Sequence, residues 1–98
     1  MRIEVTQWDI DYAANWQEDP CRNPVAMAIR RTVGIPTVAG PGPWAVIDYA
    51  TPWQTEVYLG DEPTDWLERF DNGETVEPFV FELDFDKDAH ETRRAGRR

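Results

Sequence analysis

The sequence predicts an α+β fold: a small, mostly antiparallel sheet of four to five strands with three helices, in the order β-α-α-β-β-β-α-β. One helix has recognisable start and stop signals, because Asn23 and Pro24 fit its N-terminus and Gly34 fits its C-terminus. In residues 79–86 every second side chain is apolar and all but one of the others are acidic, which is typical of a strand with one buried face. Between these elements, prolines and glycines separate short β-rich segments, which favours a meander of strands.

The N-terminal residues predict a strand followed by a short helix. Apolar and polar residues alternate over residues 3–5, so one face of this strand is expected to be buried. Thr6 is placed to cap a helix over residues 7–14, and Asp9 favours its first turn. We expect Trp8 to lie on the buried side of this helix.

Three β-rich segments follow the helix that Gly34 ends. Turns that contain proline and glycine separate them. We expect Trp44, at the start of the second segment, to face the core. The strands are expected at residues 37–39, 44–49 and 55–59.

The third helix lies within residues 61–73. Trp66 and Phe70 recur at helical spacing and define its buried side. Two N-terminal caps fit the sequence, Thr64 or, if the helix begins at the Glu-Pro pair, Asp61. The sequence leaves this choice open.

The last strand has the cleanest alternation in the chain. Its register is firmly set, because a slip of one residue would bury its carboxylates. We expect this strand to pair with the first one. The chain therefore divides into an acidic domain over residues 1–85 and a polar, basic tail over residues 86–98 that is expected to lack order. The side chains expected on the buried face are Phe79, Phe81, Leu83 and Phe85.

The net charge is strongly negative and unevenly distributed. The whole chain carries a formal charge of −9, with −11 in residues 1–85 and +2 in residues 86–98. A body this acidic repels phosphate backbones, so direct nucleic-acid binding by the body is not expected. The same field would attract a basic surface on another protein and accelerate the encounter.

The sequence contains no recognisable catalytic or metal-binding pattern. One cysteine, Cys21, and one histidine, His90, are too few for a structural zinc site. Cys21 also lacks a fixed base, because His90 lies in the tail. Asp84, Asp86 and Asp88 lack the glycine and the distal glutamate of a calcium loop. With no phosphate-binding glycine loop either, we predict a non-enzymatic protein without metal or cofactor.

The cellular location is predicted to be cytoplasmic. No apolar run approaches the roughly 18 residues of a membrane span, and the first ten residues lack the apolar core of a signal peptide. A single cysteine fits a reducing compartment.

Two tryptophans fit no apolar stripe and provide the candidate binding site. Trp16 and Trp53 both lie in connections beside acidic residues or a proline. If they are exposed, each can act as an anchor for a partner, with Glu18, Asp19 and Glu56 supplying negative charge around them. The alternative is that both fold back over the small core.

The chain resembles a family of small bacteriophage proteins of unknown function. The resemblance lies in V-T-Q-W-D-I-D, N-P-V-A-M-A-I-R and R-F-D-N-G-E-T-V-E-P-F-V-F-E-L, and it covers about 85 residues. It implies a phage origin and an actinobacterial host. Some relatives carry a C-x-x-C pair ahead of the P-V-A helix, whereas here Asn23 precedes Pro24 and only Cys21 is nearby. The resemblance therefore transfers no functional residue.

Together these observations predict a phage accessory protein that binds a host protein with a basic surface and modulates or inhibits it. One alternative is a nucleic-acid mimic, whose carboxylates would stand in for phosphates and block a DNA-binding defence protein. Another is a small-ligand binder, which would need a pocket that contains arginine. The sequence also leaves the oligomeric state open, and a homodimer could form through a sheet edge or the Trp53 loop.

Overall fold

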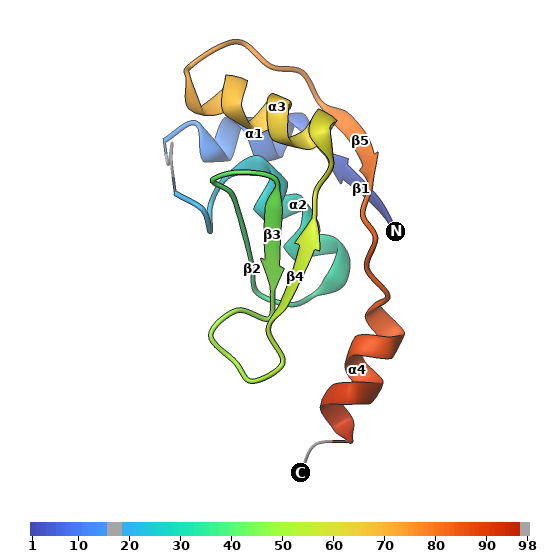
Figure 1. Ribbon diagram of the computed structural model, residues 1–98. Coiled ribbons are helices and arrows are strands. Elements are labelled where there is room, and N and C mark those ends of the chain that lie inside the picture. Colours follow the sequence, from blue (N-terminus) through green and yellow to red (C-terminus); the bar gives the residue numbers. More distant parts are fainter. Residues whose placement is uncertain (16–18, 97–98) are drawn as a thin grey trace.

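Five strands and four helices make up the described part of the chain, residues 1–15 and 19–96 of the computed structural model. The strands form two separate antiparallel sheets, one of two strands and one of three (Figure 1). The predicted α+β class is confirmed. The element order also agrees, with one additional helix at the end and two small sheets in place of one.

The two-stranded sheet joins the beginning and the end of the acidic domain. Strand β1 (Arg2–Val5) pairs with β5 (Phe79–Glu82), and Ile3 lies opposite Phe81. The expected pairing of the first and last strands is thus confirmed. Ile3 and Phe81 are buried, as the alternation of apolar and polar residues predicts.

The three-stranded sheet is a meander. Strands β2 (Thr37–Ala39), β3 (Trp44–Ile47) and β4 (Thr55–Tyr58) pair in sequence order. In Figure 1 this sheet lies in front of helix α2 (Pro24–Val33), which covers its rear face. The opposite face, toward the viewer, has no helix over it.

The first two helices begin where the sequence predicts. Helix α1 (Gln7–Ala13) has Thr6 as its N-cap, and Thr6 and Asp9 form a reciprocal capping box. Helix α2 has Asn23 as its N-cap, with the side chain accepting a hydrogen bond from the Ala26 N–H. Gly34 ends α2 at φ 72°, a conformation that glycine adopts without steric cost.

Helix α3 (Asp61–Asp71) corrects both of the predicted caps. Its N-cap is Gly60, which offers no side-chain cap, so neither Thr64 nor Asp61 has that role. The Thr64 hydroxyl instead donates to the Gly60 carbonyl inside the first turn. The buried side of α3 is as predicted, and Trp66 is only 3% exposed.

The core forms where α2 meets both sheets. Val25, Ile29 and Val33 from α2 are fully buried. The expectation that Trp8 and Trp44 face this core is wrong, because they are 62% and 48% exposed. Smaller residues take the inward positions in both elements. Those residues are Ile10 and Ala13 in α1, and Ala45 and Ile47 in β3.

Helix α4 (Lys87–Ala95) lies in the segment that is expected to lack order, so that expectation is wrong for these residues. Asp86 is its N-cap and accepts a hydrogen bond from the Ala89 N–H. The helix lies beside the loop between β3 and β4 and lengthens the molecule to 45 × 22 × 22 Å (Figure 1). Apolar periodicity gives no sign of it, because its only buried residue is His90.

Candidate binding surface

The uncovered face of the three-stranded sheet, called the outer sheet face below, carries two exposed aromatic side chains, Trp44 and Tyr58. Residues of this face alternate with buried neighbours along each strand. Trp44 lies directly opposite Tyr58, and Val46 lies directly opposite Val38 on one side and Glu56 on the other. The outer sheet face is defined by Val38, Trp44, Val46, Glu56 and Tyr58.

Trp44 and Tyr58 form an aromatic pair at one end of this face. Their ring centroids are 5.6 Å apart with an interplanar angle of 72°, an edge-to-face arrangement. Tyr58 is 50% exposed, similar to Trp44. Each ring is held by its neighbour, so it can contact a partner without a large loss of side-chain entropy.

Acidic groups border the aromatic pair. The Tyr58 hydroxyl donates to Asp61 at 3.1 Å, and this hydrogen bond raises the pKa of Tyr58. Glu56 lies on the same face as Tyr58, two residues earlier in β4. Glu62 is exposed in the first turn of α3, next to Asp61. A partner that covers the aromatic pair therefore meets negative charge at its edge.

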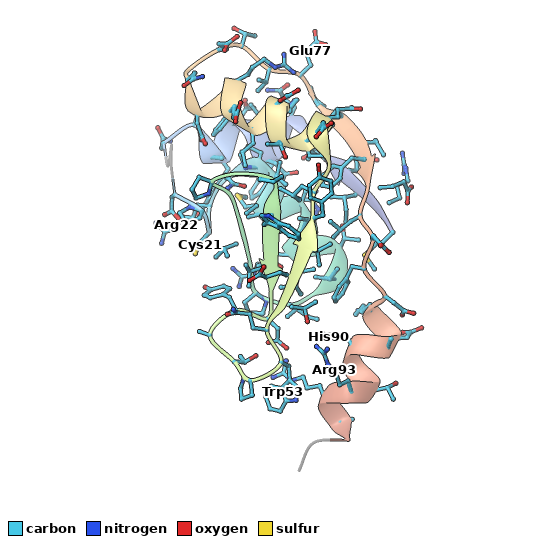
Figure 2. The ribbon with its side chains drawn as sticks, in the orientation of Figure 1. Cys21, Arg22, Trp53, Glu77, His90 and Arg93 are labelled. Atoms are coloured by element: carbon cyan, nitrogen blue, oxygen red, sulfur yellow. The ribbon has the colours of Figure 1, made fainter. Side chains whose placement is uncertain are left out.

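A second polar cluster fastens α4 to the β3–β4 loop. The Asp48 carboxylate is 2% exposed and lies 3.0 Å from His90 Nε2. Arg94 Nη1 donates to the same Asp48 oxygen at 2.9 Å. Figure 2 shows His90 and Arg93 reaching from α4 toward this loop, which carries Trp53. The carboxylate thus has two partners on one helix and fixes its position.

The contacts of His90 define its tautomer. Arg93 Nη2 lies 3.2 Å from His90 Nδ1, and a guanidinium nitrogen can only donate a hydrogen bond. This contact favours the tautomer in which Nδ1 accepts and Nε2 donates to Asp48.

Thr55, His90 and Asp48 superficially suggest a nucleophile, a base and an orienting acid. The Thr55 hydroxyl lies 3.4 Å from His90 Nδ1. However, this hydroxyl donates to the Trp53 carbonyl at 3.0 Å and accepts from Arg93 at 2.8 Å. Its proton is thus not directed at the imidazole, as nucleophilic activation would require.

The structure does not gather the sequence-predicted site residues into one patch. Trp53 is half-buried beneath Arg94, whose guanidinium carbon lies 4.8 Å from the ring centroid, so the ring helps to hold α4. Glu56 is exposed on the outer sheet face. Asp19 lies elsewhere and accepts a hydrogen bond from the Cys21 N–H. Trp16 and Glu18 lie outside the described residues.

Neither a metal-ligand cluster nor a membrane-spanning helix occurs within residues 1–15 and 19–96. Within them, no three His, Cys, Asp or Glu side chains are placed to hold a metal ion. No helix in the same ranges is long and apolar enough to cross a membrane.

Comparison with known proteins identifies no relative. No family model, curated protein or solved structure matches the chain.

Sequence reasoning missed the outer sheet face because β3 is apolar in both phases. Trp44 and Val46 point outward, while Ala45 and Ile47 point inward. The available signal was size and shape, because two small or aliphatic residues pack more easily under a helix than a tryptophan does. β4 gives a clearer signal, since Glu56 and Tyr58 share one face.

Proposed function

We propose that this chain is a non-enzymatic, phage-encoded accessory protein that binds a basic surface of a host protein and modulates that protein's activity. The observation that carries the proposal is the outer sheet face, where Trp44 and Tyr58 stand exposed beside acidic groups. Tryptophan and tyrosine are enriched among the residues that contribute most to binding energy.

Charge and anchoring have separate roles in this proposal. The formal charge of −9 accelerates the encounter with a basic partner and makes the association rate sensitive to salt. The apolar centre of the outer sheet face then provides the contact that slows dissociation. Modulation follows from occlusion, because the partner's basic surface is covered for as long as the complex lasts.

The polar cluster around His90 supports a role without catalysis. Its imidazole bridges Asp48 and Arg93, and the nearby Thr55 hydroxyl is engaged by the Trp53 carbonyl. These groups satisfy one another and hold α4 to the body. The cluster is thus explained by attachment of the helix and needs no substrate.

The test is a comparative capture from a lysate of an actinobacterial host. Trp44→Ala should weaken capture of the specific partner by at least about tenfold, as expected for a binding hot spot. Trp8→Ala is the matched control, because Trp8 is also exposed but lies on α1. Capture that survives Trp44→Ala unchanged, or that is lost equally in Trp8→Ala, contradicts the proposal.

A nucleic-acid mimic is the second candidate, supported by a row of acids on α3. Asp61, Asp65 and Glu68 are exposed at positions i, i+4 and i+7, so they follow one side of the helix. In this case the triple variant Asp61→Asn, Asp65→Asn and Glu68→Gln should abolish inhibition of a DNA-binding partner, whereas Trp44→Ala should not. The reverse pattern favours the outer sheet face.

A further inference from the structure

A groove on the α1–α2 side of the molecule has features that the proposed function does not use. Its volume is about 440 Å³, within the range of small-molecule sites. No residue that lines it belongs to the outer sheet face. Figure 2 shows Cys21 and Arg22 at this edge of the molecule, on the opposite side of the view from α4. The lining residues are Trp8, Tyr12, Cys21, Arg22, Met27, Arg30 and Arg31.

Positive charge is concentrated in this groove. Residues 1–85 contain five arginines, and three of them, Arg22, Arg30 and Arg31, line it. Three acids offset part of that charge: Asp9 binds Arg31, Glu4 also acts on Arg31, and Asp19 lies 4.0 Å from Arg22. None of these three carboxylates forms an ion pair with Arg30, which supplies the positive charge of the groove in a chain that is negative overall. Such a site selects an anion small enough to avoid the surrounding carboxylates.

The guanidinium groups of Arg31 and Arg30 differ in how they are held. Both terminal nitrogens of Arg31 bind the buried Asp9 carboxylate, at 2.6 and 2.9 Å, so its position is fixed. Arg30 is exposed in the last turn of α2, beside Arg31 in sequence. A guanidinium presents planar N–H donors that match a carboxylate or phosphate group. Arg30 is accordingly the residue that would contact the charged part of a ligand.

An aromatic platform lies along the same groove. Trp8 and Tyr12 are one helical turn apart on α1 and stack with centroids 5.3 Å apart and an interplanar angle of 17°. Tyr12 is 44% exposed, and Met27 adds a half-buried apolar side chain. The exposed surface of this stacked pair can bind the flat ring of a ligand by stacking, as nucleic-acid bases stack on aromatic side chains.

We propose that this groove binds a small organic anion that carries a flat aromatic ring. The ring stacks against Trp8 and Tyr12, and the anionic group binds Arg30. Either a phosphate or a carboxylate fits this chemistry, because a guanidinium binds both. The site is separate from the outer sheet face, so it can be occupied while a partner is bound there.

Isothermal titration calorimetry at low salt tests the proposal with four probes: adenosine monophosphate, benzoate, adenosine and inorganic phosphate. We expect at least one of the two aromatic anions to bind with a Kd on the order of 0.1 mM. Adenosine and inorganic phosphate, which each lack one half of the recognised chemistry, should bind at least about tenfold more weakly. If neither aromatic anion binds with a Kd below about 1 mM, the proposal is overturned.

Two variants locate the binding. Arg30→Gln and Trp8→Ala should each raise, by about tenfold, the Kd of whichever aromatic anion binds more tightly to the wild type. Arg69→Gln is the matched control, because Arg69 is also an exposed arginine in the last turn of a helix, on α3. Equal weakening by Arg69→Gln would indicate non-specific charge attraction and overturn the assignment. Circular dichroism confirms that each variant is folded, since all three side chains are exposed.

Discussion

Replacing Asp9 with asparagine should destabilise the fold more than any other single charge removal on α1. The Asp9 side chain is fully buried and accepts four hydrogen bonds. Two come from the Arg31 guanidinium, and two come from the N–H and the hydroxyl of Thr6. Asparagine has only one acceptor oxygen, and its amide group would face donors that the carboxylate now satisfies.

The magnitude follows from those contacts. A hydrogen bond to a charged group contributes about 1.5–3 kcal/mol. Three of the four bonds end on Asp9 Oδ2, so asparagine with its oxygen at that position loses the bond from Arg31 Nη1 and weakens the other Arg31 bond through the loss of charge. Arg31 is 46% exposed, so water can rehydrate its guanidinium and reduce the loss. We therefore expect Asp9→Asn to lower the free energy of unfolding by about 3 kcal/mol. For a domain of this size, that corresponds to a fall in Tm of roughly 15 °C.

Urea denaturation followed by circular dichroism measures this change. Asp11→Asn is the matched control, because Asp11 is exposed on the same helix and accepts a hydrogen bond from Gln7. The control should lie within about 0.5 kcal/mol of the wild type. A loss below about 1 kcal/mol for Asp9→Asn, or an equal loss in the control, would refute the reasoning.

The same carboxylate gives the stability a defined pH dependence. Burial acts to raise the pKa of Asp9, but the hydrogen bonds and charge of Arg31 and the contacts of Thr6 outweigh it. The result is a pKa below the ordinary value of 3.8. A lowered folded pKa means that the stabilisation is complete above the unfolded pKa and is lost as the pH falls through the folded value. The difference in stability between wild type and Asp9→Asn should therefore narrow below about pH 4.

Three further substitutions test other parts of the fold. His90→Ala should accelerate amide hydrogen exchange throughout α4 by at least about tenfold, because it removes the only buried side chain of that helix, whereas Thr92→Ala, at an exposed position of the same helix, should not accelerate the exchange. Gly34→Ala should cost about 1 kcal/mol in urea denaturation, from backbone strain at φ 72° alone, since no atom lies within 4 Å of an added Cβ. Ile29→Ala should cost about 3 kcal/mol in the same assay, because the side chain is fully buried in the core; a cost below 1 kcal/mol would contradict that placement.

Local signals predicted the elements that are held by local contacts. The caps at Thr6 and Asn23 and the end at Gly34 are all determined within a few residues of sequence. The alternation in β5 likewise defined which side is buried, because a shift in register would place carboxylates in the core. These features need no knowledge of the rest of the fold.

Long-range contacts explain why two tryptophans were misplaced. In α1 the side toward α2 contains Asp9, which is buried because Arg31, far along the chain, binds it. Hydrophobic periodicity predicts that an aspartate faces solvent and that a tryptophan faces the core, so it assigns the wrong side of this helix to the core. In β3 both phases are apolar, and only the burial of Ala45 and Ile47 in the core selects which side Trp44 takes.

The last helix could not be predicted for the same reason. Its single buried residue is His90, and the partners of that histidine lie on the β3–β4 loop. The sequence pattern of residues 86–98 is polar and basic, which is also the pattern of a disordered tail. The same holds for Trp53: the sequence leaves open whether it is exposed, and the contact with Arg94 of α4 decides that it is half-buried.

Hydroxyl-radical footprinting of the complex with the captured partner tests the central claim most directly. The described residues 1–15 and 19–96 include two exposed aromatic pairs, Trp44 with Tyr58 on the outer sheet face and Trp8 with Tyr12 on α1, so each serves as the control for the other. The account predicts that oxidation of Trp44 and Tyr58 falls in the complex while oxidation of Trp8 and Tyr12 does not change. Protection of the α1 pair with continued oxidation of Trp44 and Tyr58 would contradict it.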